Sequence, residues 1–167
     1  MDKRWLGVGA VVIGLAIVAY ALFARKTDEE RIREQLERLS QVVKVEGGEN
    51  PVFRSQRLAK EFETLFDKNV RVEISELGAT AGGRKELLGV AVRAATIYRS
   101  AEVNVSPERI QLLASGQAAS VDASAMVIGD RGNGPEKDER NVHFGLTRSD
   151  GDWLIDRLFV TPRSEAE

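Results

Sequence analysis

Hydrophobic positions along this chain form a continuous run, helical stripes and strand-like alternations, in that order. Residues 5–24 read WLGVGAVVIGLAIVAYALFA, without a charged side chain. In an α-helix, a run of about 20 residues spans about 30 Å, the hydrocarbon thickness of a bilayer. Basic residues flank the run on both sides, and Trp5 and Tyr20 lie near its ends, where aromatic side chains favour the membrane interface. The run predicts a transmembrane helix from Trp5 to Ala24, with the lipid bilayer as its partner.

Two other interpretations of this run are a cleaved signal peptide and a buried core helix. Ala19-Tyr20-Ala21 has the small-x-small form of a cleavage site, but the apolar run is longer than the apolar region of a signal peptide, which usually has about 7 to 15 residues. A core helix is seldom apolar on every face. The number of basic residues after the span predicts that the domain stays on the cytoplasmic side. A folded domain of this length can, however, be exported regardless of its charge. We expect a single-pass cell-membrane protein with an exported domain, periplasmic or extracellular, and the cytoplasmic side is the alternative.

Helical stripes follow the run in three places. Thr27 to Val45 is predicted to be an amphipathic helix with a capping box at Thr27 and Glu30, and it ends before Gly47-Gly48. A second helix begins near Pro51, with a buried stripe of Phe53, Leu58, Phe62, Leu65 and Phe66. Gly82-Gly83 precedes a third, well-buried helix from Arg84 to Tyr98.

Alternating patterns predict strands, one before the third helix and the rest after it. The predicted strands are Val70–Ile74, Glu102–Val105, Arg109–Ala114, Ala118–Ile128, Val142–Arg148 and Trp153–Val160. Residues 129–141, GDRGNGPEKDERN, are polar and turn-rich, and they predict a long mobile loop. Helices followed by a run of antiparallel strands indicate an α+β domain with helices against one sheet face.

Composition narrows the function classes. The chain has 167 residues, 43% of them hydrophobic and 30% charged, as in a globular protein, and no cysteine, which excludes disulfides and thiolate chemistry. The formal net charge is −2 and residues 1–26 carry +3, so the rest of the chain carries about −5. Because binding to a phosphate backbone needs clustered basic residues, this charge disfavours a nucleic-acid partner. The predicted organisation is an anchor with basic flanks (1–26), a first helix and linker (27–50), the rest of one domain (51–161) and a flexible tail (162–167).

Two sequence features resemble a known superfamily. They are the glycine-led third helix at Gly83-Arg84-Lys85-Glu86-Leu87 and the ending LTRSDGDWLI at residues 146–155, which looks like a penultimate strand, a hairpin turn and a final Trp-x-Ile strand. With the order of elements, residues 32–160 resemble the nuclear transport factor 2-like (NTF2-like) superfamily, also called SnoaL-like or cystatin-like α+β. The resemblance implies a cone of about three helices on a curved, mainly antiparallel sheet, often with a central pocket and often dimeric. It implies no single function.

Four residues are candidates for catalysis. His143, the only histidine, is predicted to lie on the strand face opposite Val142 and Phe144. It is either a general base, with Asp122 as its orienting partner and Tyr98 as a donor, or an ordinary surface histidine. Asp122 is otherwise an edge-facing aspartate. Asp156 shares a strand side with Leu154 and Leu158, so it is either a buried, paired carboxylate or a solubilising one.

No cofactor or metal ligand set is predicted, because one histidine, no cysteine and scattered carboxylates show no ligand spacing. We therefore expect a membrane-anchored, non-catalytic domain that binds a protein partner or a small apolar ligand. We also expect it to form a homodimer through the curved sheet. The first alternative is an assembly component with membrane-protein partners, since the architecture looks like that of VirB8-like secretion proteins. The second is a small isomerase, dehydratase or hydrolase.

Overall fold

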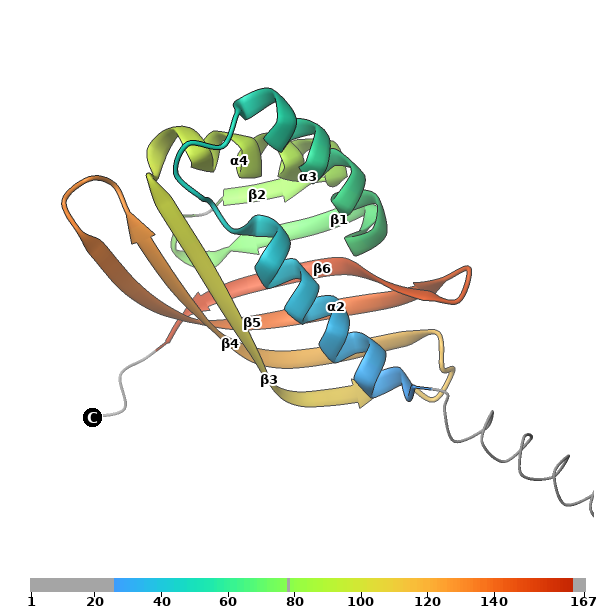
Figure 1. Ribbon diagram of the computed structural model, residues 1–167. Helices are drawn as coiled ribbons and strands as arrows, with labels where there is room; N and C mark the ends of the chain where they lie inside the picture. Colours follow the sequence, from blue (N-terminus) through green and yellow to red (C-terminus); the bar gives the residue numbers. More distant parts are fainter. Residues whose placement is uncertain (1–25, 78, 164–167) are drawn as a thin grey trace, which may run out of the picture.

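A computed structural model describes residues 26–77 and 79–163 (Figure 1). The predicted membrane span Trp5–Ala24 lies outside these residues, and so do residues 164–167 of the predicted tail. The elements, in chain order, are α2 (Asp28–Val43), α3 (Pro51–Leu65), β1 (Phe66–Ile74), the 3-10 turn η1 (Ser75–Leu77), β2 (Ala79–Gly82), α4 (Arg84–Ile97), β3 (Ser100–Leu112), β4 (Ala118–Asp130), β5 (Pro135–Ser149) and β6 (Asp152–Pro162). Within the described ranges, no helix is long and apolar enough to cross a bilayer.

The six strands form one curved sheet in the order β2-β1-β6-β5-β4-β3. Neighbouring strands are antiparallel except β1 and β6, which are parallel. All three helices lie on one side of the sheet: α2 crosses β3, and α3 and α4 lie side by side over β1 and β2 (Figure 1). The predicted α+β class, with three helices on a curved and mainly antiparallel sheet, is confirmed.

Local sequence signals set the ends of α2 and α3. Thr27 and Glu30 form the predicted capping box, in which each side chain accepts a hydrogen bond from the other residue's backbone N–H. The apolar stripe of α2, which includes Ile32 and Leu36, is buried. Asn50 caps α3, whose first residue is Pro51, a favoured position for proline because its missing N–H is not needed there. Two of the three predicted helix starts are therefore fixed by side-chain caps.

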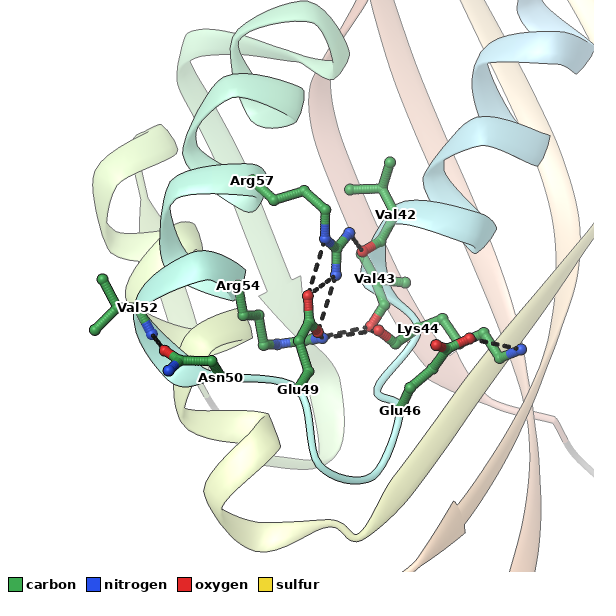
Figure 2. A network of polar contacts seen from close by, with 9 residues as sticks. All are labelled: Val42, Val43, Lys44, Glu46, Glu49, Asn50, Val52, Arg54 and Arg57. Carbon is green, nitrogen blue, oxygen red and sulfur yellow. Dashed lines mark hydrogen bonds and ion pairs between the residues drawn. The ribbon is translucent and has the colours of Figure 1, made fainter.

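An arginine–glutamate network joins the end of α2 to the start of α3 (Figure 2). Arg54, only 1% exposed, donates to the carbonyl oxygens of Lys44 (2.8 Å) and Val43 (3.4 Å) and to Glu49 (2.9 Å). Arg57 donates to the Val42 carbonyl (3.2 Å) and pairs with Glu49. Because the last carbonyls of a helix lack partners within it, these arginines satisfy the end of α2.

The charge of Glu49 is set by the same network. Its partial burial alone would raise the pKa of its carboxyl group. The hydrogen bonds from Arg54 and Arg57, together with their charges, outweigh that effect and hold the pKa of Glu49 below its ordinary value. Glu49 therefore remains ionised and compensates the buried Arg54 guanidinium.

Two strand predictions are wrong. The segments predicted as separate strands at Glu102–Val105 and Arg109–Ala114 form, up to Leu112, the single strand β3, which continues through a bulge between Pro107 and Arg109. Residues 129–141, predicted as a long mobile loop, are mostly paired: β4 continues to Asp130 and β5 begins at Pro135. Asp130 closes the short turn by accepting from two glycine N–H groups, Gly132 (2.6 Å) and Gly134 (3.2 Å).

Two helix predictions also need correction. Phe53, assigned to the buried stripe of the second helix, is 68% exposed, because it lies on the first turn of α3, beyond the part that packs on the sheet. Phe66 is buried but begins strand β1. The third predicted helix is α4, and it is not well buried: none of its residues is fully buried.

Candidate ligand-binding cavity

A cavity of about 250 Å³ lies between the helices and the inner face of the sheet. Its lining comes from all three helices and from strands β1, β3, β4, β5 and β6. Sixteen of the seventeen lining residues are apolar, and Arg140 is the exception among the residues that the structure describes: Leu39, Val43, Phe62, Phe66, Val72, Leu87, Val90, Ala91, Val103, Val105, Ala125, Val127, Arg140, Val142, Phe144, Leu158 and Val160. The cone therefore has an apolar recess, open to the surface, beside its packed core.

Helix α4 forms one wall of this cavity. Leu87, Val90 and Ala91 line it, and the first and last of these are only partly buried. Val90 is 46% exposed while it also lines the cavity, so the cavity reaches the surface beside α4. Helix α4 begins at Arg84, and the preceding N-cap residue, Gly83, provides no side-chain hydrogen bond to its first turn. The helix packs on the core through partly buried residues, which include Leu88 and Val92, and borders the cavity with Leu87, Val90 and Ala91.

The chemistry of the lining determines what the cavity accepts. A buried water needs two to four polar partners, and the lining presents no polar atoms to the cavity, since Arg140 contributes only its apolar stem. Apolar cavities of this kind stay dry or take up hydrocarbons, as an engineered cavity of about 150 Å³ does with benzene. The geometry therefore suits a small apolar molecule better than a polar one.

Arg140 lies where the cavity meets solvent. It precedes Val142 and Phe144 by two and four residues on β5, so it shares their inward-facing side. Its side chain is 24% exposed and makes ion pairs with Asp138 and with Glu76 of η1. The hydrogen bonds to Asp138 and then to Glu76 raise the pKa of Arg140 despite the opposing effect of burial. A permanent positive charge, held by two carboxylates, therefore marks the rim of an apolar cavity.

His143 and Asp122, two of the predicted catalytic residues, are brought together. They face each other on β5 and β4, with 2.7 Å between His143 Nδ1 and Asp122 Oδ1. Both side chains are about half exposed, 46% and 51%. They alternate with inward-facing residues, so they lie on the outer face of the sheet, away from the cavity, as predicted for His143. The pair is open to water, without the enclosure that strengthens electrostatic catalysis.

Tyr98 is not part of this pair. Its hydroxyl accepts a hydrogen bond from Arg131 (2.7 Å), and the Arg131 guanidinium also lies over the Tyr98 ring. The ring rests against Gly129, where an added Cβ would approach Tyr98 Cε1 to 2.7 Å. Tyr98 therefore packs on the β4–β5 hairpin, and the structure does not place it as a donor beside His143.

Asp156 occupies a bulge that changes its predicted side. Gly145 pairs with Arg157 while Leu146 pairs with Ile155, so Asp156 is the extra residue in β6. Its Oδ1 lies 2.6 Å from the position of a Cβ on Gly145, on the outer face of the sheet. The assumption of one continuous side shared with Leu158 is wrong, because the bulge reverses the alternation. Asp156 is half-buried and away from the cavity.

Sequence reasoning missed Arg140 as a functional residue. The alternation of Val142, Phe144 and Leu146 is clear, and extending it back by one step places Arg140 on the same side. Residues 136–141 are all polar, however, so no contrast between faces marks the beginning of the strand. Within the described residues, no group of three His, Asp or Glu side chains has the geometry of a metal site.

Comparison with known proteins shows similarity in fold and no match in sequence family. No protein-family model matches the chain, and no curated protein matches it. An NTF2-like protein with a cystatin-like fold from Novosphingobium aromaticivorans is 16% identical and superposes with a TM-score of 0.63, covering 91% of this chain and 90% of that one. A domain of unknown function with a cystatin-like fold from Nostoc punctiforme is 18% identical, with a TM-score of 0.63 and coverage of 85% and 81%.

A third solved structure, from Novosphingobium aromaticivorans, is provisionally named a scytalone dehydratase. It is 16% identical, with a TM-score of 0.62 and coverage of 84% of this chain and 95% of that one. The chain thus has the cystatin-like α+β fold of NTF2-like proteins, as its sequence resemblance implies. At such identities the likeness extends to the fold alone, because one fold supports many functions.

Proposed function

We propose that this chain is a membrane-anchored, non-catalytic NTF2-like domain that binds a small apolar ligand inside its cone. The observation that carries the proposal is the cavity of about 250 Å³, whose walls are apolar except for Arg140 and which reaches the surface beside α4. Ligand sites are typically concave and mostly apolar, with few polar groups that fix orientation. By comparison with benzene in about 150 Å³, this volume suits a ligand body of about ten non-hydrogen atoms.

The distribution of exposed apolar residues favours a ligand over a protein partner on the sheet. A protein-binding scaffold is expected to have a filled cone and an apolar patch on the outer sheet face. The strongly exposed large apolar side chains in the described ranges lie on α3, on α4 and around the end of β3: Val52, Phe53, Val90, Ile97, Leu112 and Leu113. The outer face carries the His143–Asp122 pair instead.

The proposed anchor, Trp5–Ala24, gives this cavity a location. Helix α2 begins at Asp28, four residues after the end of the run, so the domain is held beside the bilayer on the side to which it is exported. Apolar molecules partition into membranes, and a domain at the surface samples them at high local concentration. A homodimer and a membrane-protein partner stay predictions.

The test is binding of naphthalene to the whole chain in lipid nanodiscs, with isotope-labelled valine and leucine methyl groups followed by NMR. Saturable shifts are expected for Val105 and Val127, which line the cavity, and not for the buried Val121, which does not. Empty nanodiscs correct for partition into lipid. The absence of saturable shifts at the lining residues would contradict the proposal. Recovery of other membrane proteins from mild detergent, in that case, would favour the secretion-assembly alternative.

A further inference from the structure

The hairpin that joins β3 to β4 is unusual in its lack of charge. Residues 110–121 read IQLLASGQAASV, without a charged side chain, in a chain that is 30% charged. They form the end of β3, the connecting turn and the start of β4. The β4–β5 hairpin, at the other end of the same strands, reads DRGNGPEKDER over residues 130–140. The two ends of the sheet therefore present different surfaces to their surroundings.

Leu112 and Leu113 make the surface of the β3–β4 turn apolar. They are 42% and 49% exposed. Leu112 follows Ile110 by two residues, so it lies on the side of the sheet that carries the helices, at the very end of the strand. Backbone hydrogen bonds close the turn, from the N–H of Leu113 to the carbonyl of Ala118 (2.9 Å) and from the N–H of Gly116 to the carbonyl of Leu113 (2.8 Å). This exposed leucine pair gains free energy wherever it can leave water.

The same end of the sheet lies next to the start of α2, where the chain arrives from the predicted membrane span. Asp28, the first residue of α2, accepts hydrogen bonds from Arg148 (3.3 Å) and from the ring N–H of Trp153 (3.2 Å). The backbone N–H of Arg148 donates in turn to the carbonyl of Gln117, in the β3–β4 turn (2.8 Å). Figure 1 shows the start of α2 beside the β3–β4 and β5–β6 turns, with the β4–β5 hairpin at the opposite end.

Short distances connect the turn to the expected position of the bilayer. The predicted span ends at Ala24, and the four-residue step to Asp28 covers at most about 14 Å. Neighbouring strands lie about 5 Å apart, so β3 lies about 10 Å across the sheet from Arg148 on β5. The headgroup layer on each side of the hydrocarbon is roughly 5 to 8 Å deep. An anchored domain therefore has its β3–β4 turn within reach of that layer.

The charges beside the turn favour a neutral lipid surface. Asp150 and Asp152, in and beside the β5–β6 turn, are exposed carboxylates at this end of the sheet. Lys26, a basic residue on the same side, pairs with Glu34. Anionic lipids attract clusters of unpaired basic residues and repel carboxylates. Contact through the two leucines therefore fits a leaflet of neutral phospholipids better than an anionic one.

We infer that the β3–β4 turn is a second membrane contact, in which Leu112 and Leu113 enter the headgroup layer of a neutral leaflet beside the anchor. The inference rests on the membrane anchoring in the proposed function. Apolar side chains of surface-bound segments commonly enter the boundary between headgroups and acyl chains. An anchor with a short linker leaves the tilt of a domain free, whereas two contacts fix it. Strand β3, with 13 residues, then extends about 40 Å away from the turn.

Two paramagnetic probes test the inference on the unmodified whole chain in phosphatidylcholine nanodiscs, with labelled leucine and isoleucine methyl groups followed by NMR. One probe is a lipid with a nitroxide high on its acyl chain, and the other is a water-soluble gadolinium chelate. The nitroxide should broaden the signals of Leu112 and Leu113, and the chelate should spare them. Ile97, 56% exposed beside the start of β3, is the matched control and should show the opposite response.

A charged substitution tests whether the leucines hold the turn in the lipid. Leu113→Asp should shift the insertion equilibrium towards water by at least about tenfold, because a carboxylate is far costlier than leucine in a bilayer. The chelate should then broaden Leu112. Val52→Asp makes the same kind of change at the exposed start of α3 and should leave Leu112 protected. Unchanged methyl shifts of the buried Leu36 will show that both variants fold.

Three results would overturn the inference. If the chelate broadens Leu113 as strongly as Ile97 in the unmodified chain, the turn lies in water, although the anchoring stands. If the leucine signals shift only when two chains share a nanodisc, the turn contacts a second copy and not lipid. If the chain does not enter nanodiscs at all, the anchoring and the inference fail together. Saturable binding of naphthalene at Val105 and Val127 tests the cavity separately in each case.

Discussion

Filling the cavity from one wall should stabilise the domain, whereas the same substitution two residues away should destabilise it. Ala123 and Ala125 both point inward from β4 and are equally buried, at 4% and 5% exposed. Only Ala125 lines the cavity. The pair Ala125→Leu and Ala123→Leu therefore compares the same chemical change on the same strand face, with and without empty space in front of it.

The expected magnitudes follow from burial and crowding. Leucine adds three carbons to alanine, and each buried carbon contributes about 0.8 kcal/mol, from which about 1 kcal/mol is lost as side-chain entropy. Ala125→Leu should thus raise the free energy of unfolding by about 1 kcal/mol. Ala123→Leu, which adds its carbons to the buried side of β4 outside the cavity, should lower it by about 1 to 3 kcal/mol because neighbouring side chains must move.

The assay is urea unfolding of the whole chain in nanodiscs, followed by Trp153 fluorescence. Trp153 is 3% exposed in the core, and Trp5→Phe in every variant removes the second tryptophan. Equal slopes with shifted midpoints report stability alone. Ala125→Leu should also weaken binding of naphthalene by at least tenfold, while Ala123→Leu should not. If both variants lose stability to the same extent, the space beside Ala125 is not empty in solution and the reasoning is refuted.

Three further substitutions test the packing around the cone. Glu49→Gln should lower the free energy of unfolding by about 2 kcal/mol at neutral pH, because Arg54 is left without its compensating charge. Since the pKa of Glu49 is lowered in the folded state, this difference between variant and unmodified chain should decline as the pH falls below about 4.5 and vanish below the folded pKa. Urea unfolding midpoints measured against pH will show it. Gly129→Ala should cost about 1 to 3 kcal/mol through its clash with Tyr98, and a double-mutant cycle with Tyr98→Ala should recover most of this loss. Gly89→Ala on α4, where the added Cβ meets only the Arg93 side chain at an ordinary contact distance of 3.7 Å, should raise stability by about 0.5 to 1 kcal/mol in thermal unfolding, and a loss would show that α4 is strained where it borders the cavity.

The elements predicted well from the sequence are those whose signals are local. The capping box at Thr27, the Asn50-Pro51 start and the stripe through Leu36 each depend on residues within a few positions, so the ranges of α2 and α3 follow closely. The hairpin turn at Asp150-Gly151 is equally local, and both residues have positive φ. Elements fixed by distant contacts were harder to predict: the paired segment after Gly129 is held by its neighbour in the sheet, and its polar residues show no alternation.

The site was less predictable than the fold because a cavity is a property of what the packing leaves empty. Helix α4 has the composition of a buried helix, and nothing in its sequence distinguishes a helix packed wholly on side chains from one that borders a cavity. The candidates chosen for their chemistry, His143 and Asp122, are indeed neighbours, but on the opposite face of the sheet. Their pairing follows from the β4–β5 register, which single-strand patterns do not reveal.

Strand pairing places Arg140 and Asp156 on the sides of the sheet opposite to those expected. Arg140, assigned to a loop, is in regular β5 geometry and therefore shares the inward side of Val142 at the cavity rim. Asp156, assigned to a regular strand, sits in the β6 bulge, which turns it outward over Gly145 while Leu158 returns to the inner face. Since one residue of register reverses every side chain beyond it, the side of the sheet on which Arg140 and Asp156 lie is decided by strand pairing and not by the composition of either segment.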